Sequence, residues 1–132
     1  MQKTINGETS LIGVIGQPVS QSLSPVMHNA ALAEMNLNWC YIAIPCNPAQ
    51  IPIALEALRA FDFKGLNITI PHKQNVAKLC NDLTPIAQRL KAVNTLIPNQ
   101  NDGWTGANTD VEGFLSPLLS KQWQGRKALI LG

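Results

Sequence analysis

Short apolar segments of the kind that forms β-strands alternate with segments of helical periodicity, and this alternation constrains the fold more than any other feature. The strand-type segments cover residues 11–16, 39–45, 65–70, 93–97, 104–107 and 127–131. When helices separate successive strands, the strands pair mostly in parallel, because each helix returns the chain to the same end of the sheet. The pattern therefore predicts an α/β fold: a three-layer, open, mainly parallel twisted sheet with helices on both faces.

The first helix is expected to begin at Ser24-Pro25, because serine is a favoured N-cap residue and proline suits the first helical position. Met27, Ala31 and Met35 follow at helical spacing, which predicts that they lie on the buried face of this helix. The same face would be broadened by Val26, Ala30 and Ala33.

The remaining connections also carry local signals. A second helix is expected to begin near Gln50, because Pro52 is tolerated only in a first turn. Thr109 and Glu112 have the spacing of a capping box at the start of a later helix. The other predicted elements are a short helix at about residues 74–79, a helix behind Thr84-Pro85, the capped helix over residues 109–119, and a hairpin joining residues 93–97 to 104–107.

The composition favours a globular domain of ordinary size and argues against several classes of partner. Of the 132 residues, 45% are apolar and 14% are charged, which is typical of a chain that folds around one core. The net charge is only +2, without a basic run, so no nucleic-acid partner is expected. No stretch approaches the roughly 20 apolar residues of a membrane span. The polar start of the chain lacks the form of a signal peptide, which predicts a cytoplasmic location.

The cysteines and histidines do not predict a metal site. Cys40, Cys46 and Cys80 form an odd set without C-x-x-C spacing, so free thiols in a reducing cytoplasm explain them better than disulfides. His28 and His72 have no partner at metal-ligand spacing, and structural zinc needs four ligands. We therefore expect no metal.

Lys73 directly follows an apolar strand, in the segment Gly65-Leu66-Asn67-Ile68-Thr69-Ile70-Pro71-His72-Lys73. In an open α/β sheet, ligands bind outside the carboxyl ends of the strands. Most lysines are simply solvated, but Asn67 and Thr69 share one side of this strand, because alternate residues share a face. Buried polar side chains need partners, and a polyhydroxylated ligand would provide them.

Asp110 and Asn94 lie at two further predicted element ends. An aspartate in a first turn is favoured by the helix dipole alone, and an asparagine can satisfy a turn by bonding its own backbone. A functional interpretation remains open beside these structural ones. If the fold brings Lys73 and Asp110 into one cleft, the pair can bind a ligand oxygen and move a proton.

Ser22 and Ser24 have the same two interpretations. Ser24 can be a simple N-cap and Ser22 a loop serine. Hydroxyls at a helix N-terminus, together with free backbone N–H groups, also favour an anion such as a small carboxylate. A capping hydroxyl can accept a second partner, so the two interpretations are compatible.

Taken in order, these segments resemble the substrate-binding domain of the shikimate dehydrogenases. The resemblance covers about residues 11–132 and rests on several ordered motifs. The motifs are Gly16-Gln17-Pro18-Val19, Ser22-Leu23-Ser24-Pro25, the segment from Gly65 to Lys73, Ala92-Val93-Asn94-Thr95, Gly106-Ala107-Asn108-Thr109-Asp110 and Gly113-Phe114.

The resemblance implies NADPH-dependent reversible reduction of 3-dehydroshikimate to shikimate in aromatic amino-acid biosynthesis. It implies that Lys73 and Asp110 form the catalytic pair. Ser22 and Ser24 would bind the substrate carboxylate. The ring oxygens would be bound by Thr69, Lys73, Asn94 and Asp110, with Asn67 lining the pocket.

The resemblance also implies that part of such an enzyme is missing. Lys-x-Leu-Ile-Leu-Gly resembles the first strand of a Rossmann-type domain, with Gly132 as the first cofactor-binding glycine. We therefore expect a substrate domain over residues 1–122 and the start of an NADP-binding domain over residues 123–132. NADP(H) would be bound mainly by the absent half, so the chain alone would not turn over. The oligomeric state stays open, and a homodimer is compatible with the sequence.

Two alternatives remain open at the sequence level. The chain could belong to a quinate/shikimate dehydrogenase, since related enzymes accept quinate. It could also be a binding module that recognises shikimate without catalysis.

Overall fold

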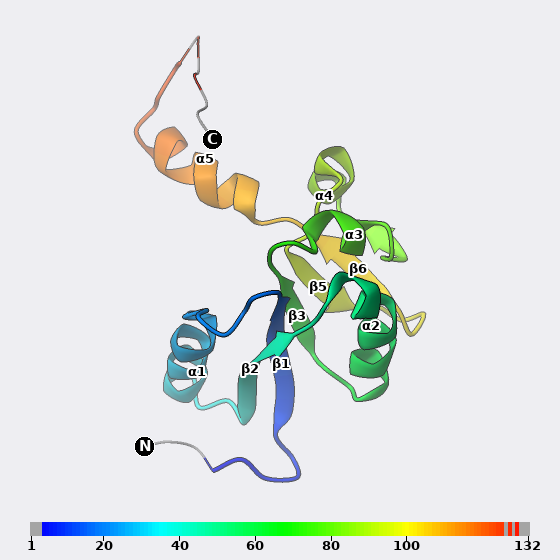
Figure 1. The fold of residues 1–132 in the computed structure, drawn as a ribbon. Helices are drawn as coiled ribbons and strands as arrows, with labels where there is room; N and C mark the ends of the chain where they lie inside the picture. The colour runs from blue at the N-terminus through cyan, green and yellow to red at the C-terminus, as the bar shows by residue number, and fades with distance from the viewer. Residues whose placement is uncertain (1–3, 126, 128, 130–132) are drawn as a thin grey trace.

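The computed structural model describes residues 4–125, 127 and 129 (Figure 1). The elements in chain order are β1 (Ser10–Gly16), α1 (Ser24–Glu34), β2 (Trp39–Pro45), a 3₁₀ turn η1 (Pro48–Gln50), α2 (Ile51–Ala60), β3 (Gly65–Ile68), α3 (Lys73–Ala77), β4 (Asp82–Leu83), α4 (Pro85–Leu90), β5 (Thr95–Pro98), β6 (Trp104–Ala107) and α5 (Asp110–Ser120). No helix within the described residues is long and apolar enough to cross a membrane.

The strands form a six-stranded mixed sheet in the order β2-β1-β3-β5-β6-β4. β1 pairs in parallel with β2 and β3, and β4 pairs in parallel with β6. β5 is antiparallel to both β3 and β6, so it is the one strand that runs against the others. The prediction of a mainly parallel α/β sheet is confirmed, and so is the hairpin, which forms between β5 and β6.

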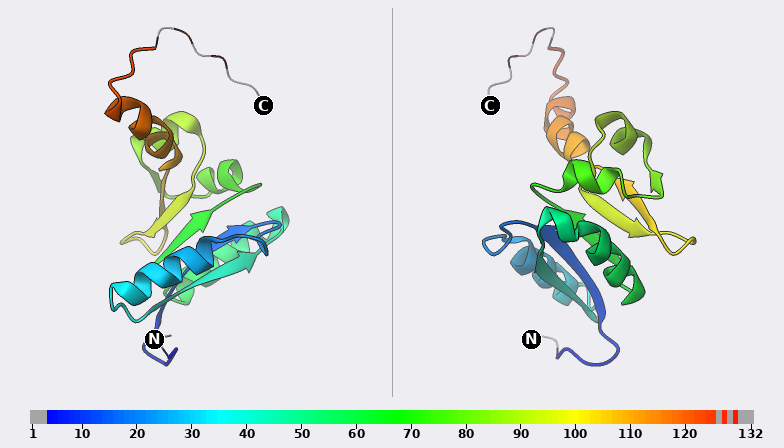
Figure 2. Two further views of the ribbon diagram at one scale, coloured as in Figure 1. Left: turned by 90° about the vertical axis from the view of Figure 1, so that its left-hand side faces the viewer. Right: turned by 45° about the vertical axis from the view of Figure 1, so that its right-hand side comes forward.

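The core is divided between the two faces of the sheet, because neighbouring residues of β1 point to opposite sides. Ile15 belongs to the larger apolar cluster, which includes Ile51 and Leu55 of α2. Val14 belongs to a smaller cluster with Leu32 of α1 and Tyr41 of β2. The helices α1 and α2 therefore cover opposite faces, as Figure 2 shows from two further directions.

The predicted buried face of α1 is wrong. Met27 and Met35 are 61% and 66% exposed, and Leu32 is the buried residue of this helix. The helix instead faces the sheet with His28, which stacks on Tyr41, and Asn29, whose amide bonds the Tyr41 backbone. Apolar residues lie on nearly every side of this helix, so their spacing could not identify the face that packs.

β3 is shorter than predicted, because the chain turns earlier than its apolar pattern suggests. β3 ends at Ile68 rather than Ile70, and the His72 N–H closes a turn on the Thr69 carbonyl. Pro71 in this turn has no N–H with which to extend a strand ladder. The two-residue strand β4 was not predicted, since Asp82–Leu83 is too short to show a periodicity.

The helix α5 extends away from the sheet (Figure 1), and none of its residues is buried. Phe114 and Leu119 are 72% and 67% exposed. The predicted strand over residues 127–131 falls largely outside the described residues, and the predicted cofactor glycine, Gly132, lies outside them entirely.

The predicted cap of α4 is confirmed and gives a stability test. Thr84 adopts an extended conformation before Pro85, and its hydroxyl accepts a hydrogen bond from the Ala87 N–H at 3.4 Å. We expect Thr84→Ala to lower the free energy of unfolding by about 1 kcal/mol, because that N–H loses its partner. Urea denaturation measures the loss, and Thr84→Ser, which keeps the hydroxyl, is the matched control. Equal stability of the alanine and serine variants would contradict the capping role.

Candidate functional site

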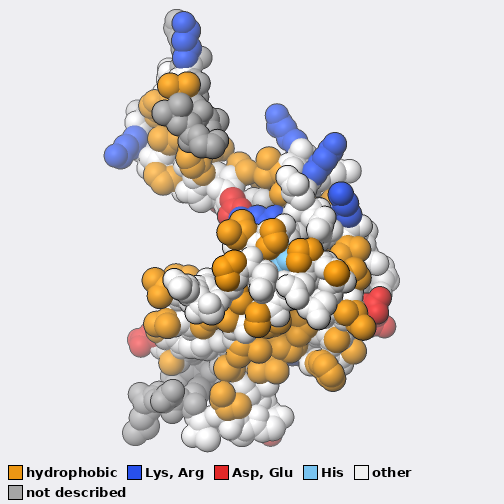
Figure 3. Space-filling model, in the orientation of Figure 1, with side chains coloured by type: hydrophobic (Ala, Val, Ile, Leu, Met, Phe, Trp, Pro, Cys, Tyr) orange, Lys and Arg blue, Asp and Glu red, His pale blue; other side chains and the backbone are white. Residues whose placement is uncertain are grey.

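The candidate site lies at the edge of the sheet where β1, β3 and β6 end. Because β5 runs in the opposite direction, its first residues lie at this same edge, beside the last residues of β3 and β6. The backbone of Asn94 joins them: its carbonyl accepts from Ile68 N–H at 2.8 Å, and its N–H donates to the Ala107 carbonyl at 3.0 Å. Figure 3 shows the surface hollowed between α1 and α5, where acidic and basic side chains meet.

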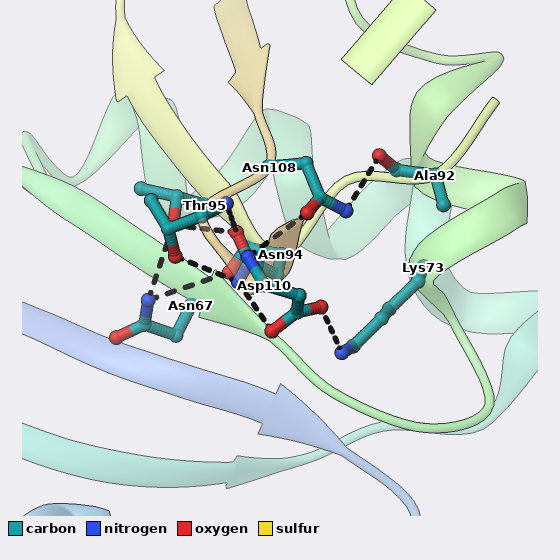
Figure 4. A network of polar contacts seen from close by, with 8 residues as sticks. Asn67, Lys73, Ala92, Asn94, Thr95, Asn108 and Asp110 are labelled. Atoms are coloured by element: carbon teal, nitrogen blue, oxygen red, sulfur yellow. Dashed lines mark hydrogen bonds and ion pairs between the residues drawn. The ribbon is translucent and has the colours of Figure 1, made fainter. Parts of the chain in front are cut away.

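Lys73 and Asp110 form an ion pair at this edge. Lys73 is the first residue of α3 and Asp110 is the first residue of α5, so two helix starts bring them together. Lys73 Nζ lies 2.7 Å from Asp110 Oδ2, and the side chains are 32% and 53% exposed (Figure 4). The expectation that the fold places a lysine and an aspartate in one site is met. The pair is open enough to reach a ligand.

The surroundings of Asp110 favour its charged form. The hydrogen bond from Lys73 is the main reason that the pKa of Asp110 lies below its ordinary value, and the charge of Lys73 and a hydrogen bond from Asn94 act in the same direction. Partial burial acts against them. A lowered pKa means that the ion pair persists as the pH falls and is lost only when the pH passes through that lowered value.

Removing the lysine charge should therefore raise the pKa of Asp110. We expect Lys73→Met to move the titration of the Asp110 carboxyl carbon to higher pH, because the largest stabilising contact of the carboxylate is gone. A ¹³C-detected NMR titration measures this shift. The matched control is Lys78→Met, just beyond the end of α3, where the side chain is exposed and should leave Asp110 unchanged. An unchanged Asp110 titration in the Lys73 variant would contradict the pairing.

Asn94 fixes Asp110 through a saturated amide group. Its Nδ2 donates to Thr109 Oγ1 and to Asp110 Oδ1, both at 2.9 Å. Its Oδ1 accepts from the Thr95 hydroxyl at 2.9 Å and from the Thr109 N–H at 3.0 Å. All the donors and acceptors of the amide are therefore engaged. A ligand hydroxyl that reaches Asn94 has to replace one of these partners.

The capping box predicted between Thr109 and Glu112 is not formed. Thr109 is the residue before α5, but its side chain makes no cap hydrogen bond to the helix. Its hydroxyl and its N–H are both used by Asn94. The start of α5 is thus held by tertiary contacts with the β5 end, which a local four-residue pattern does not reveal.

Asn108 is a further structural member of the site that sequence reasoning did not assign. It is only 8% exposed, and its Nδ2 donates to the Ala92 carbonyl at 3.1 Å. Its Oδ1 accepts from the Asp110 N–H at 3.0 Å (Figure 4). Asn108 therefore fixes the backbone from which the Asp110 side chain extends. The only sequence signal was an asparagine at a predicted strand end.

Ser22, Ser24 and Thr69 line one hollow of ≈ 550 Å³, together with Val14, Pro18, Val19, Ser20, Gln21 and Ile70. The prediction that Ser24 is the N-cap of α1 is wrong. The cap position is Leu23, and Ser24 is the first helical residue. The Ser22 hydroxyl instead accepts from the Ser24 N–H at 3.2 Å. The reason is that Leu23 already has helical dihedral angles, which moves the helix start one residue earlier than the serine-proline pattern suggests.

Asn67 lies apart from this hollow and contacts protein groups. Its Oδ1 accepts from the Tyr41 hydroxyl at 2.7 Å, and its Nδ2 donates to the Asn94 carbonyl at 3.3 Å. The sequence analysis expected a ligand to supply the polar partners of Asn67, but protein groups supply them. Asn67 and Tyr41 line a separate hollow of ≈ 240 Å³ on the α1 side of the sheet.

No group of three or more histidine, cysteine, aspartate and glutamate side chains that could hold a metal ion occurs among the described residues. The three cysteines are free thiols.

A family model and two curated relatives identify the same family of proteins. A family model described as the shikimate dehydrogenase substrate binding domain matches residues 14–96. The shikimate dehydrogenase (NADP(+)) of Synechocystis sp. is 52% identical over 131 residues, which are 98% of this chain and 45% of that protein. The enzyme of the same name from Prochlorococcus marinus (strain MIT 9215) is 49% identical over 128 residues, 97% of this chain and 45% of that protein.

Solved structures give the same result. A shikimate dehydrogenase in complex with NADP⁺ superposes with a TM-score of 0.87 at 34% identity, covering 96% of this chain and 44% of that one. The shikimate 5-dehydrogenase of Listeria monocytogenes, in complex with shikimate and NAD, superposes with a TM-score of 0.85 at 33% identity, covering 94% of this chain and 43% of that one. The chain thus spans about 45% of the length of its curated relatives.

Proposed function

Because this chain belongs to the shikimate dehydrogenase family, whose substrate-binding domain its residues 14–96 match, we propose that its site binds shikimate and 3-dehydroshikimate. The observation that carries the proposal is the Lys73–Asp110 pair, held at 2.7 Å at the sheet edge where ligands bind in open α/β folds. An ammonium and a carboxylate side by side can bind a hydroxyl or carbonyl oxygen and exchange a proton with it.

The remaining candidate residues complete the proposed site. Ser22 and Ser24, at the start of α1, would bind the substrate carboxylate, because a helix start attracts an anion through its free N–H groups. Thr69 lines the same hollow and would bind a ring oxygen. Asn94 would bind a second ring oxygen by exchanging one of its present partners for it. Asn67 would line the pocket behind these contacts.

We propose that Lys73 and Asp110 are the catalytic pair for NADP-dependent reduction of 3-dehydroshikimate. NADPH supplies the hydride when it is bound. The described residues contain no glycine-rich strand-to-helix turn of the dinucleotide-binding kind, so the proposal assigns cofactor binding mainly to residues outside them, including Gly132. Negative charge that develops on the substrate oxygen would be stabilised and then protonated by the Lys73 ammonium. Asp110 would orient both Lys73 and the substrate hydroxyl.

The proposal also covers the partner, the cellular location and the oligomeric state of the protein. The small net charge of +2 favours a small molecule over nucleic acid as the partner, and three free thiols favour a cytoplasmic location. A substrate domain over residues 1–122 would include α5 to its last residue, Ser120. Sedimentation of the purified protein tests whether it is the homodimer that the sequence allows.

The decisive experiment is a calorimetric titration of the 132-residue chain with shikimate. We expect saturable binding that weakens in Lys73→Ala and Asp110→Ala. Lys78→Ala and Asp102→Ala are matched controls, because these side chains are exposed outside the site and should leave the affinity unchanged. Quinate is titrated in parallel, and tighter binding of quinate would reassign the substrate.

If the folded 132-residue chain does not bind shikimate, the essential contacts come from residues outside this chain or from a different site. The titration is then repeated on a chimera in which this chain replaces the matching 45% of the Synechocystis relative. Binding by the chimera that is indifferent to Lys73→Ala and Asp110→Ala would refute the site assignment.

A further inference from the structure

Tyr41 is a buried phenol that lies between residues of the candidate site but has no assigned role. It is only 3% exposed, and its hydroxyl donates to Asn67 Oδ1 at 2.7 Å. Its ring stacks on His28 with centroids 4.3 Å apart and planes at 10°. Asn29 donates to the Tyr41 carbonyl and accepts from the Tyr41 N–H, both at 2.8 Å. The backbone, the ring and the hydroxyl of Tyr41 are therefore all fixed.

The hydroxyl of Tyr41 determines how the Asn67 amide is oriented. Because Oδ1 receives the phenol proton, Nδ2 has to face β5, where it lies 3.3 Å from the Asn94 carbonyl and 3.5 Å from Thr95 Oγ1. The Thr95 hydroxyl donates in turn to Asn94 Oδ1 at 2.9 Å, and Asn94 holds Asp110. A continuous series of hydrogen bonds thus connects Tyr41 to the Lys73–Asp110 pair, and Figure 4 shows the part of the series from Asn67 onward.

Tyr41 also holds α1, the helix that begins at Ser24, because its ring stacks on His28 and its backbone bonds the Asn29 amide. Burial raises the pKa of Tyr41 to about 12, and the polar Ser24 side chain offsets part of that rise. The phenol therefore stays protonated, as a neutral donor to Asn67, throughout the pH range in which the protein can be assayed. His28 and Asn29 belong to α1 and Asn67 belongs to β3, so Tyr41 on β2 contacts both elements.

We propose that Tyr41 is a positioning residue of the site: its hydroxyl fixes the Asn67 amide while its ring and backbone hold α1, and so it sets the separation between the serines at the start of that helix, Ser22 and Ser24, and the Lys73–Asp110 pair. This inference rests on the proposed function and deepens it. A rigid ligand that carries a carboxylate at one position and hydroxyls at others requires that separation to be fixed before it binds.

The test is Tyr41→Phe, which keeps the ring, the stack on His28 and most of the volume but removes the donor. We expect the dissociation constant for shikimate to rise about tenfold, as for the loss of one well-placed hydrogen bond. In an Asn67→Ala background, the same substitution should change the affinity less than about twofold, because neighbouring groups that act together are not additive. If Tyr41 had a structural role alone, Tyr41→Phe would lower the melting temperature, and its effect on the affinity would not depend on whether Asn67 is present. An affinity within about twofold of the wild type in Tyr41→Phe, or equal losses in both backgrounds, would overturn the inference.

A second measurement needs no ligand and separates this inference from the proposed function. In a ¹⁵N-correlated NMR spectrum, the Asn67 side-chain amide should shift and exchange faster with water in Tyr41→Phe, whereas the Asn29 amide, which bonds only backbone groups, should keep its position. If the wild type fails to bind shikimate but the Asn67 amide is released, the positioning role stands and the substrate is wrong. An unchanged Asn67 amide would overturn the positioning role whatever the ligand.

Discussion

Lys73→Ala is expected to lower kcat by about 10²- to 10⁴-fold, the range for loss of a positioned general acid. The assay uses the dehydrogenase chimera in which this chain replaces the matching part of the Synechocystis relative. The physical reason is that, in the proposed mechanism, the Lys73 ammonium, 2.7 Å from Asp110, would neutralise charge that develops on the substrate oxygen. The KM should change far less, because this interaction strengthens only as the carbonyl is reduced.

A control variant and a chemical rescue make the Lys73→Ala result interpretable. Lys78→Ala removes an exposed lysine from just beyond the end of the same helix, and its kcat should match that of the unsubstituted chimera. Added methylamine should restore part of the activity of Lys73→Ala, because a small ammonium ion can occupy the space left by the side chain. A Lys73→Ala chimera whose kcat stays within about threefold of the parent value would remove Lys73 from the chemistry.

His72→Ala is expected to lower the free energy of unfolding by about 3 kcal/mol, more than any surface substitution near the site. His72 is fully buried, and its Nε2 lies 2.8 Å from the Cys46 carbonyl, which ties the start of α3 to the segment after β2. Alanine would leave both a cavity and a buried carbonyl without its donor. Because Lys73 is the next residue, the loss should also loosen the Lys73–Asp110 pair.

Urea denaturation followed through the fluorescence of buried Trp104 measures the effect. The control is Gln74→Ala, two residues further along α3, where the side chain is exposed and the change should be within about 0.5 kcal/mol. His72→Gln, which retains a donor amide, should recover part of the loss. Equal stabilities of the His72→Ala and Gln74→Ala variants would contradict a structural role for the imidazole.

Local signals predicted the elements well where one strong determinant controlled them. β2 has its predicted bounds, Trp39–Pro45, because four of its seven residues are aromatic or β-branched. The helix after η1 begins at Ile51, next to the predicted Gln50, and Thr84 caps α4 as its Thr-Pro pattern suggests. In each case the relevant contacts lie within a few residues along the chain.

Two of the errors arose where groups far apart in the sequence interact. Thr109 has the spacing of a capping box, but its hydroxyl is used by Asn94, fifteen residues earlier. The exposed face of α1 is as apolar as its buried one, and Asn29 and His28 decide its orientation through Tyr41. Tyr41 itself gave no sequence signal beyond that of a strand aromatic.

The α/β class, the order of the elements other than β4 and the residues at the sheet edge could be predicted, because apolar periodicity and turn residues act locally. The sequence also singled out Lys73 and Asp110 as candidates. The tertiary contacts bring their charged atoms together, connect Asn94 to Thr109 and Asp110, and connect Asn108 to Ala92 and Tyr41 to Asn67. Those contacts link residues 15 to 37 positions apart. Their geometry depends on the antiparallel direction of β5, which no short segment of the sequence encodes.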